Sequence, residues 1–123
     1  MICLDTNYLI LGLVSGSRES REIAAWFAAG EQLVAPTLVW FEFLCGPVTR
    51  AQVRTMRAFL HVLVPFDEPQ AITAAHLFNA AARKRSTRVD AMIAATAIVA
   101  DAALATNNAT DFLPFRDSGL RLA

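Results

Sequence analysis

Ile2-Cys3-Leu4-Asp5-Thr6-Asn7 is the stretch that decides the fold class, because three apolar residues run directly into three polar ones. A short uninterrupted apolar run is typical of a strand that is buried on both faces, and the polar residues after it are typical of a turn or a helix cap. Strands buried on both faces belong to parallel sheets that helices cover on both sides. The opening residues therefore predict the first strand of an α/β domain.

The rest of the chain repeats this pattern of short apolar runs separated by longer helical stretches. Further strands are expected at residues 32–35, 61–64, 102–105 and 120–122, and helices at 18–29, 37–45, 49–60, 69–85 and 89–100. Pro69 suits a first helical position, while Gly30 and Gly46-Pro47 are stop signals. The alternation predicts a three-layer α/β/α domain with a central parallel sheet. In such sheets, ligands bind beyond the carboxyl ends of the strands.

Length and composition agree with a single ordered domain. The chain has 123 residues, of which 55% are hydrophobic and 18% charged, and this excludes disorder over most of its length. The longest apolar stretch, residues 89–106, contains Asp90 and Asp101, so we expect no membrane span. The N-terminus has no signal-peptide pattern, which favours a cytoplasmic location. Cys3 and Cys45 lie far apart, so we expect buried thiols rather than a disulfide or a zinc site.

Four acidic residues stand out, although each has an ordinary structural explanation. Asp5 can cap a helix, and Glu42 can be one polar position on a partly exposed helix. Residues 87–90, Thr-Arg-Val-Asp, have the spacing of a capping box that would account for Asp90. Asp111 lies in a polar loop where an Asp is common.

Their combined placement favours a metal site. Asp5 and Asp111 follow predicted strands, and Glu42 and Asp90 lie near the starts of helices that flank the same sheet edge. Carboxylates that converge repel one another, raise one another's pKa values and oppose folding unless a cation neutralises them. Oxygen ligands favour Mg²⁺ or Mn²⁺, and Mg²⁺ leaves coordination positions open for a phosphodiester. A metal that lowers the pKa of water and stabilises the leaving oxygen makes a nuclease the expected activity.

With these acids, Leu4-Asp5-Thr6-Asn7, residues 90–95 and residues 106–112 in view, the chain resembles the PIN-domain ribonucleases. More narrowly, it resembles the VapC toxins of type II toxin–antitoxin systems over essentially its whole length. The resemblance implies an endoribonuclease that depends on Mg²⁺ or Mn²⁺ and is neutralised by a cognate VapB antitoxin. It also implies a homodimer.

The resemblance carries over to individual residues. Asp5, Glu42 and Asp90 match the first three acids of the family, and Asp111 matches the acid of its terminal Asn-x-x-Asp-Phe segment. The supporting polar positions of the family are matched by Thr6, Asn7, Thr106 and Asn108. Some PIN domains carry an acid directly after the Thr-Asn pair, whereas this chain has Asn108 there. This difference leaves open whether Asp111 is a direct ligand and whether the site takes one metal ion or two.

The charge distribution suits an RNA substrate. The net charge is 0, so once the four acids are set aside the other residues carry +4. Arg85 and Arg88 come shortly before Asp90 and are expected to contact substrate phosphates, the alternative being a solvated helix terminus. A mean hydropathy of +0.41 is high for a small domain and favours apolar surface covered by another chain.

Two functions from other classes compete with the nuclease hypothesis. The first is a non-catalytic PIN-like module that binds RNA or a partner protein without turnover. The second is phosphotransfer through Asp5, which is disfavoured because Asp5-Thr6-Asn7 lacks the second Asp of a DxD motif. The sequence leaves the target RNA open, since recognition of RNA depends on groove shape and RNA folding as well as on side-chain contacts.

Overall fold

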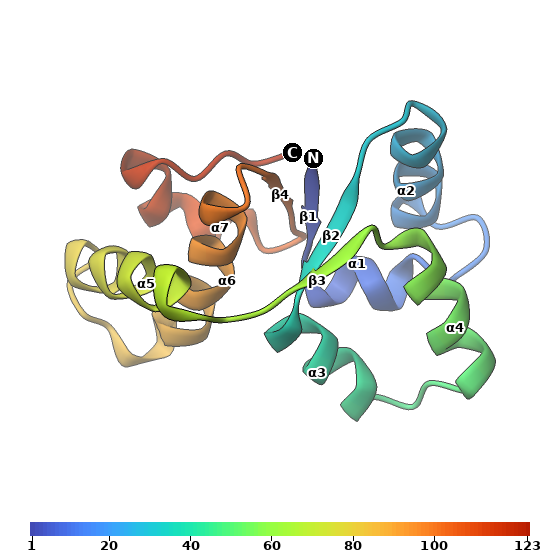
Figure 1. Cartoon of the computed structure of the whole chain (residues 1–123), viewed down its shortest axis with the longest axis horizontal. Helices are drawn as coiled ribbons and strands as arrows, with labels where there is room; N and C mark the ends of the chain where they lie inside the picture. Colours follow the sequence, from blue (N-terminus) through green and yellow to red (C-terminus); the bar gives the residue numbers. More distant parts are fainter.

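Four short parallel strands form the centre of the molecule. The computed structural model describes residues 1–123, and its single sheet contains β1 (Ile2–Leu4), β2 (Leu33–Pro36), β3 (Val62–Val64) and β4 (Ala103–Ala105). The strand order is β3-β2-β1-β4, so β1 lies between β2 and β4 (Figure 1). Cys3 of β1 is in register with Val34 on one side and Leu104 on the other. All three residues are completely buried, as their apolar character predicts.

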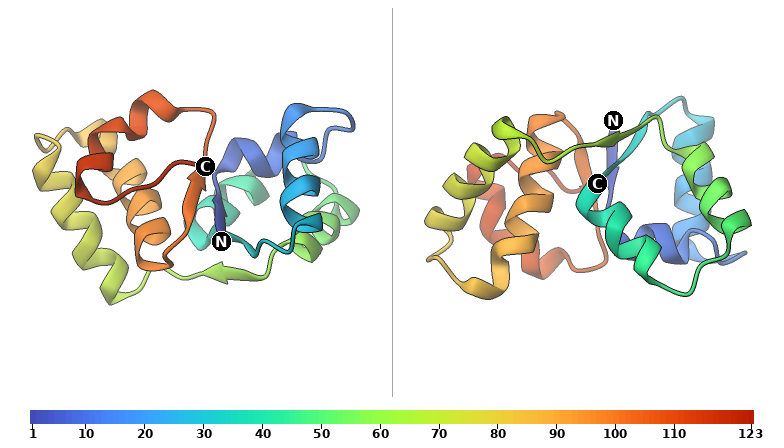
Figure 2. Two further views of the ribbon diagram at one scale, coloured as in Figure 1. Left: turned by 90° about the horizontal axis from the view of Figure 1, so that it is seen from above. Right: turned by 60° about the horizontal axis from the view of Figure 1, so that its bottom comes forward.

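Helices cover both faces of this sheet and make three layers. The helices are α1 (Thr6–Leu11), α2 (Arg18–Ala28), α3 (Thr37–Cys45), α4 (Arg50–Phe59), α5 (Glu68–Ala80), α6 (Arg88–Val99) and α7 (Ala109–Phe112), with 3₁₀ turns η1 (Arg85–Thr87) and η2 (Leu113–Ser118). Helices α1 to α4 lie on one side of the strands and α5 to α7 on the other (Figures 1 and 2). The predicted α/β/α architecture is confirmed.

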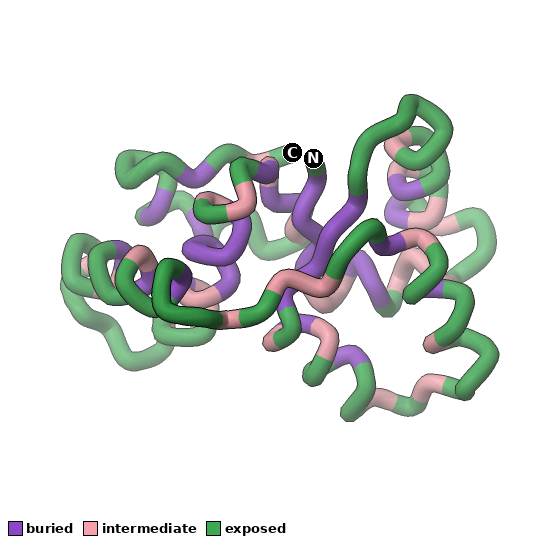
Figure 3. The backbone as a smooth tube through the Cα atoms, viewed as in Figure 1, coloured by how far each residue is buried: buried purple, intermediate pink, exposed green.

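The core follows the strands and the inner faces of the helices (Figure 3). Its largest completely buried side chains include Phe43 of α3 and Phe115 of η2. Among the glycines, Gly12, which caps the carboxyl end of α1, has the closest neighbours. An added Cβ there would stand 2.5 Å from the carbonyl oxygen of Tyr8 and 2.6 Å from Cδ1 of Ile23. Glycine is therefore the residue that lets α1 approach α2.

Two of the predicted elements are wrong. Residues 120–122 form no strand, because their contact with the sheet is a single bridge between Leu122 and Leu104. The helix predicted over 69–85 ends at Ala80, because Ala82 and Arg83 adopt left-handed backbone angles with φ of 63° and 57°. This turn reverses the chain so that α6 packs against α5, and tertiary packing here overrides a helix-favouring sequence.

Other local predictions can be compared with the structure. The stop signals are confirmed, since α2 and α3 end immediately before Ala29-Gly30 and Gly46. Short helices such as α1 and α7 were not predicted as separate elements. Cys3 is buried as expected, but Cys45 is exposed, so the expectation of two buried thiols is wrong for the second. None of the helices has the length and apolar character needed to cross a bilayer.

Candidate functional site

An acid-lined hollow lies at the carboxyl ends of the strands, where the topology predicts a ligand site. Its volume is about 220 Å³. The residues that line it come from four segments of the chain and are Asp5, Thr6, Asn7, Glu42, Val89, Asp90, Ile93 and Asn108. We call it the acidic hollow. Three of the four predicted acids and three of the four predicted supporting residues are thus brought together.

Asp5 is the most firmly held of the acids. It follows β1, caps the N-terminus of α1 and is 6% exposed. Its Oδ1 accepts a hydrogen bond from the backbone N–H of Thr6 at 2.8 Å, and its Oδ2 accepts one from the hydroxyl of Thr106 at 2.8 Å. The Thr106 hydroxyl also accepts a hydrogen bond from the backbone N–H of Asn108 at 3.0 Å. Asp5 therefore both caps α1 and lines the acidic hollow. Thr106 holds its carboxylate from outside the hollow.

Glu42 and Asp90 reach the hollow from two helices. Glu42 lies in the second turn of α3 rather than near its start, and its Oε2 accepts a hydrogen bond from the Thr6 hydroxyl at 3.3 Å. Asp90 lies in the first turn of α6 and is half-buried. The capping box expected over residues 87–90 is absent, because the Thr87 hydroxyl donates to the carbonyl oxygen of Lys84 instead. Helix capping by a Thr87–Asp90 pair therefore does not account for Asp90.

The pKa of Asp90 responds to its burial and to the charges of the other acids. Its pKa is raised from the ordinary value of 3.8 to about 6, first because partial burial disfavours its charged form. The charges of Asp111, Asp5 and Glu42 add to this effect, in that order. Asp111 lies in the first turn of α7, is exposed and does not line the acidic hollow, although its charge reaches Asp90. The four acids thus form one electrostatic group with three of them at the hollow.

The donor set fits a hard divalent cation in its chemistry. Carboxylate, hydroxyl and amide oxygens line the hollow, with no histidine and no thiol. As the side chains stand, no three His, Cys, Asp or Glu residues are close enough together to enclose a metal ion. Mg²⁺ in proteins is commonly held by one or two carboxylates and several waters, so it does not need a closed cage. Asp5, Asp90 and Glu42 are the residues of the hollow that could hold such an ion.

A network beside the hollow was missed by sequence reasoning. Glu19, in the first turn of α2, is 7% exposed and accepts hydrogen bonds from the side chains of Asn107 at 3.3 Å and Arg18 at 3.2 Å. Arg18 also donates to Asn107 at 2.6 Å. The pKa of Glu19 is lowered, first by a hydrogen bond from its own backbone N–H and then by the hydrogen bonds from Asn107 and Arg18. The only local signal was an acid in a helix's first turn, which ordinarily means a contact with the helix dipole.

The two arginines expected at substrate phosphates lie outside the acidic hollow. Arg88 begins α6, and its guanidinium carbon lies 5.7 Å from the centre of the Phe78 ring on α5. Arg85 belongs to η1 and is exposed. Neither side chain lines the acidic hollow, so neither is placed at a phosphate that would sit there.

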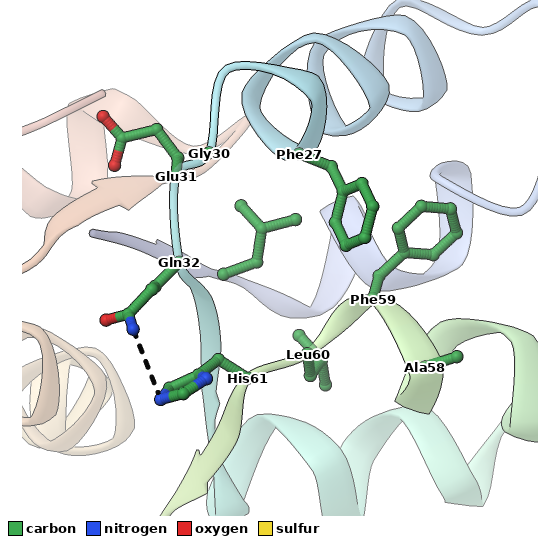
Figure 4. A pocket seen from close by; sticks show the side chains of 9 residues that line it. Phe27, Gly30, Glu31, Gln32, Ala58, Phe59, Leu60 and His61 are labelled. Carbon is green, nitrogen blue, oxygen red and sulfur yellow. Dashed lines mark hydrogen bonds between the residues drawn. The ribbon is translucent and has the colours of Figure 1, made fainter.

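A larger hollow of about 350 Å³ lies at the opposite, amino ends of β2 and β3 (Figure 4). The rings of Phe27 and Phe59 meet edge to face there, and Nε2 of His61 lies 3.5 Å from Nε2 of Gln32. The Glu31 carboxylate points away from this hollow and pairs with the N-terminal amine at 2.8 Å. Glu31 is the single acid among its lining residues, whereas three acids line the smaller acidic hollow.

Several solved structures have a fold similar to that of this chain. A chain in a toxin-antitoxin complex from Klebsiella pneumoniae is 28% identical over 92% of this chain and 91% of its own length, with a TM-score of 0.71. VapBC2 from Rickettsia felis, bound to a DNA fragment from their promoter, gives a TM-score of 0.75 at 18% identity over 100% and 98% of the two chains. FitAcB from Neisseria gonorrhoeae gives 0.70 at 22% identity over 99% and 96%.

A search of curated proteins finds no significant match. The family model of the PIN domain, in contrast, matches residues 2–113, which takes in every strand and all four acids. The family resemblance seen in the sequence is therefore confirmed, with a fold similar to that of chains in VapBC and FitAB complexes. The chain belongs to the PIN domain family.

Proposed function

We propose that this chain is a VapC-like toxin, an endoribonuclease that depends on Mg²⁺ or Mn²⁺ and acts on RNA in the cytoplasm. The observation that carries the proposal is the acidic hollow, because folding gathers acids from separate segments at the place where open α/β sheets bind ligands. The pKa of Asp90 is raised first by partial burial and then by the charges of Asp111, Asp5 and Glu42, which supports mutual repulsion among these acids. A bound divalent cation would remove that repulsion.

The proposed roles follow from how each acid is held. Asp5 is oriented by its two hydrogen bonds, so it is the principal candidate metal ligand. Asp90 lines the hollow together with Asp5, and Glu42 is oriented by the hydroxyl of Thr6. Asp111 adds negative charge from outside the hollow. Asn7 and Asn108 line the wall, where their amide groups can hydrogen-bond to a substrate phosphate or to ordered water.

The proposed reaction is hydrolysis of a phosphodiester. A divalent cation at the hollow would lower the pKa of water and stabilise the charge of the leaving oxygen. The oxygen of water forms a bond to phosphorus while the bond from phosphorus to the 3′ oxygen breaks. One water proton ends on that 3′ oxygen, which gives a 3′-hydroxyl and a 5′-phosphate. The carboxylates hold the reacting groups in position, and no serine, cysteine or histidine nucleophile is needed.

The proposal extends to protein partners. The similar structures named above are toxin–antitoxin complexes, which supports a VapB-type antitoxin as the inhibitor of this chain. The structure leaves large apolar side chains exposed on α3, with Phe41 66% and Leu44 47% exposed. Contiguous apolar surface favours burial against another chain, so we also propose a homodimer. Light scattering of the purified protein, with and without the antitoxin, tests both associations.

The nuclease proposal is tested by incubating total and structured RNA with antitoxin-free protein in Mg²⁺, Mn²⁺ or EDTA. We expect discrete fragments with 5′-phosphate ends in either metal and none in EDTA. Asp5→Asn should abolish cleavage, whereas Asp117→Asn, the same change at an exposed position on η2, should retain it. Cleavage that survives Asp5→Asn or Asp90→Asn would refute the assignment. RNA that is bound but never cut would favour the non-catalytic binding module.

A further inference from the structure

A cluster of four cations forms the corner between α5 and α6. Arg83, Lys84, Arg85 and Arg88 fall within six consecutive positions, and all four are exposed. The salt bridges of the molecule involve other cations, namely Arg18, Arg121 and the N-terminal amine. The corner therefore carries positive charge that no acidic side chain of the protein neutralises.

Two of these arginines are held in place by one aromatic ring. The guanidinium carbon of Arg83 lies 5.8 Å from the centre of the Phe78 ring, and that of Arg88 lies 5.7 Å from it. Arg83 also donates a hydrogen bond to Oδ1 of Asn79 at 2.8 Å. Cation–π contacts of this kind order the guanidinium groups before any ligand arrives, which lowers the entropy cost of binding. Two ordered guanidinium groups beside one ring favour the binding of an anion next to them.

The position of Arg88 relative to the acidic hollow is fixed by α6. Val89, Asp90 and Ile93 face the acidic hollow, whereas Arg88 faces α5 and lines a small apolar groove with Phe78. The first turn of α6 thus presents Asp90 to the acidic hollow and Arg88 to α5. A ligand that spans both must be longer than one phosphate group.

We propose that Arg83 and Arg88, held on Phe78, bind the backbone phosphates of the RNA strand beyond the bond that is cut. This inference rests on the proposed function. Guanidinium groups match phosphate oxygens in geometry and charge, and a nucleic acid presents phosphates at regular intervals. An acidic peptide is a poorer occupant, because it has no phosphodiester to place at the neighbouring acidic hollow, the site of the proposed reaction. The pair therefore positions RNA that enters the hollow next to it.

The test measures RNA binding in the absence of metal, so that it does not depend on cleavage. Asp5→Asn protein in EDTA is titrated against a fluorescent single-stranded RNA of about 12 nucleotides, and anisotropy is followed at several salt concentrations. Adding Arg83→Gln and Arg88→Gln should weaken binding roughly tenfold at low salt. It should also reduce the slope of log K against log salt by about 1.4, since each contact with single-stranded nucleic acid contributes about 0.7.

A matched control variant distinguishes the loss of the binding site from the loss of net positive charge. Arg21→Gln with Arg54→Gln removes the same charge from α2 and α4, on the other side of the sheet (Figure 1). This control should lower affinity clearly less than the Arg83/Arg88 variant and leave the salt slope nearly unchanged. Equal losses in the two variants, or no loss in either, would overturn the inference.

Phe78→Leu examines the ring itself. It retains both arginines but removes the surface that orders them, so we expect a severalfold loss of affinity with the salt slope preserved. Unchanged affinity in a folded Phe78→Leu protein would overturn the positioning role of the ring. Should this half-buried substitution impair folding, the double arginine variant changes only exposed side chains and still decides the matter. If wild-type protein never cleaves RNA but the arginine variants lose binding, the proposed function fails while the binding of RNA by the arginine pair stands.

Discussion

Replacing Asp90 by Asn should stabilise the metal-free protein at neutral and alkaline pH. In the folded state the pKa of Asp90 is about 6 rather than 3.8, because burial and the neighbouring acids disfavour its charge. An acid with a raised pKa contributes stability below its unfolded pKa and loses it as the pH rises through the folded pKa. The ionised Asp90 therefore opposes folding above about pH 6, and the amide of Asn, which has nearly the same shape, does not.

The magnitude follows from the same pKa. A rise of about two pH units corresponds to about 3 kcal/mol of free energy of unfolding. Asp90 is half-buried, and solvent screening reduces this value, so we expect a gain of about 1 to 1.5 kcal/mol. In a domain of this size the gain raises the melting temperature by about 3 to 7 °C. At pH 4, where folded Asp90 is protonated, the variant should gain little.

Thermal and urea unfolding of wild type and Asp90→Asn, in EDTA and low salt at pH 4 and pH 8, measure this difference. Addition of Mg²⁺ at about ten times its dissociation constant should stabilise the wild type by about 1.4 kcal/mol and the variant by less. A variant that is no more stable than wild type at pH 8 would refute the electrostatic reasoning. So would an equal gain at both pH values, since that would show a packing effect.

Three further outcomes can be measured on the same protein. Thr106→Val removes the hydroxyl that donates to Asp5, so RNA cleavage should fall sharply and stability by about 1 to 2 kcal/mol in urea unfolding, whereas Thr106→Ser should preserve both. Gly12→Ala should cost about 1 to 3 kcal/mol in the same assay, because its Cβ would meet Ile23, and a neutral result would show that α1 can shift. Glu19 has a lowered pKa, so its contribution is present above pH 4.5 and lost on acidification. Glu19→Gln should therefore reduce the loss of unfolding free energy on acidification. An unchanged dependence of stability on acidic pH would contradict a stabilising role of the Glu19 hydrogen bonds.

Much of the fold was predictable because its local signals agree with its tertiary structure. The apolar run at residues 2–4 can be buried only by neighbours on both sides, and the similar runs that became β2, β3 and β4 share this property. Residues 81–85 show the limit of this reasoning, because their alanines and basic residues favour a helix in isolation. The need to turn α6 back onto α5 decides their conformation, and that need is not visible locally.

The candidate site was predictable to a similar degree. Carboxyl ends of parallel strands meet at one edge, so the gathering of Asp5 and Asp90 at one hollow could be expected from topology. The direction of Arg88 could not, because packing of its side chain on Phe78 depends on how two helices meet. The pairing of Glu19 with Asn107 joins residues 88 positions apart, and no local pattern indicates it.

The central position of β1 has a consequence for the timing of synthesis. The strand that Asp5 follows lies between β2 and β4, and the hydroxyl that holds the Asp5 carboxylate comes from a residue 101 positions later. A growing chain can pair one edge of β1 early, but the other edge stays open until residues 103–105 have been made. Contacts this distant in sequence form late in folding. An incomplete chain therefore holds Asp5 without Thr106 or Asp111, so the acidic hollow is complete only after nearly the whole polypeptide has been translated.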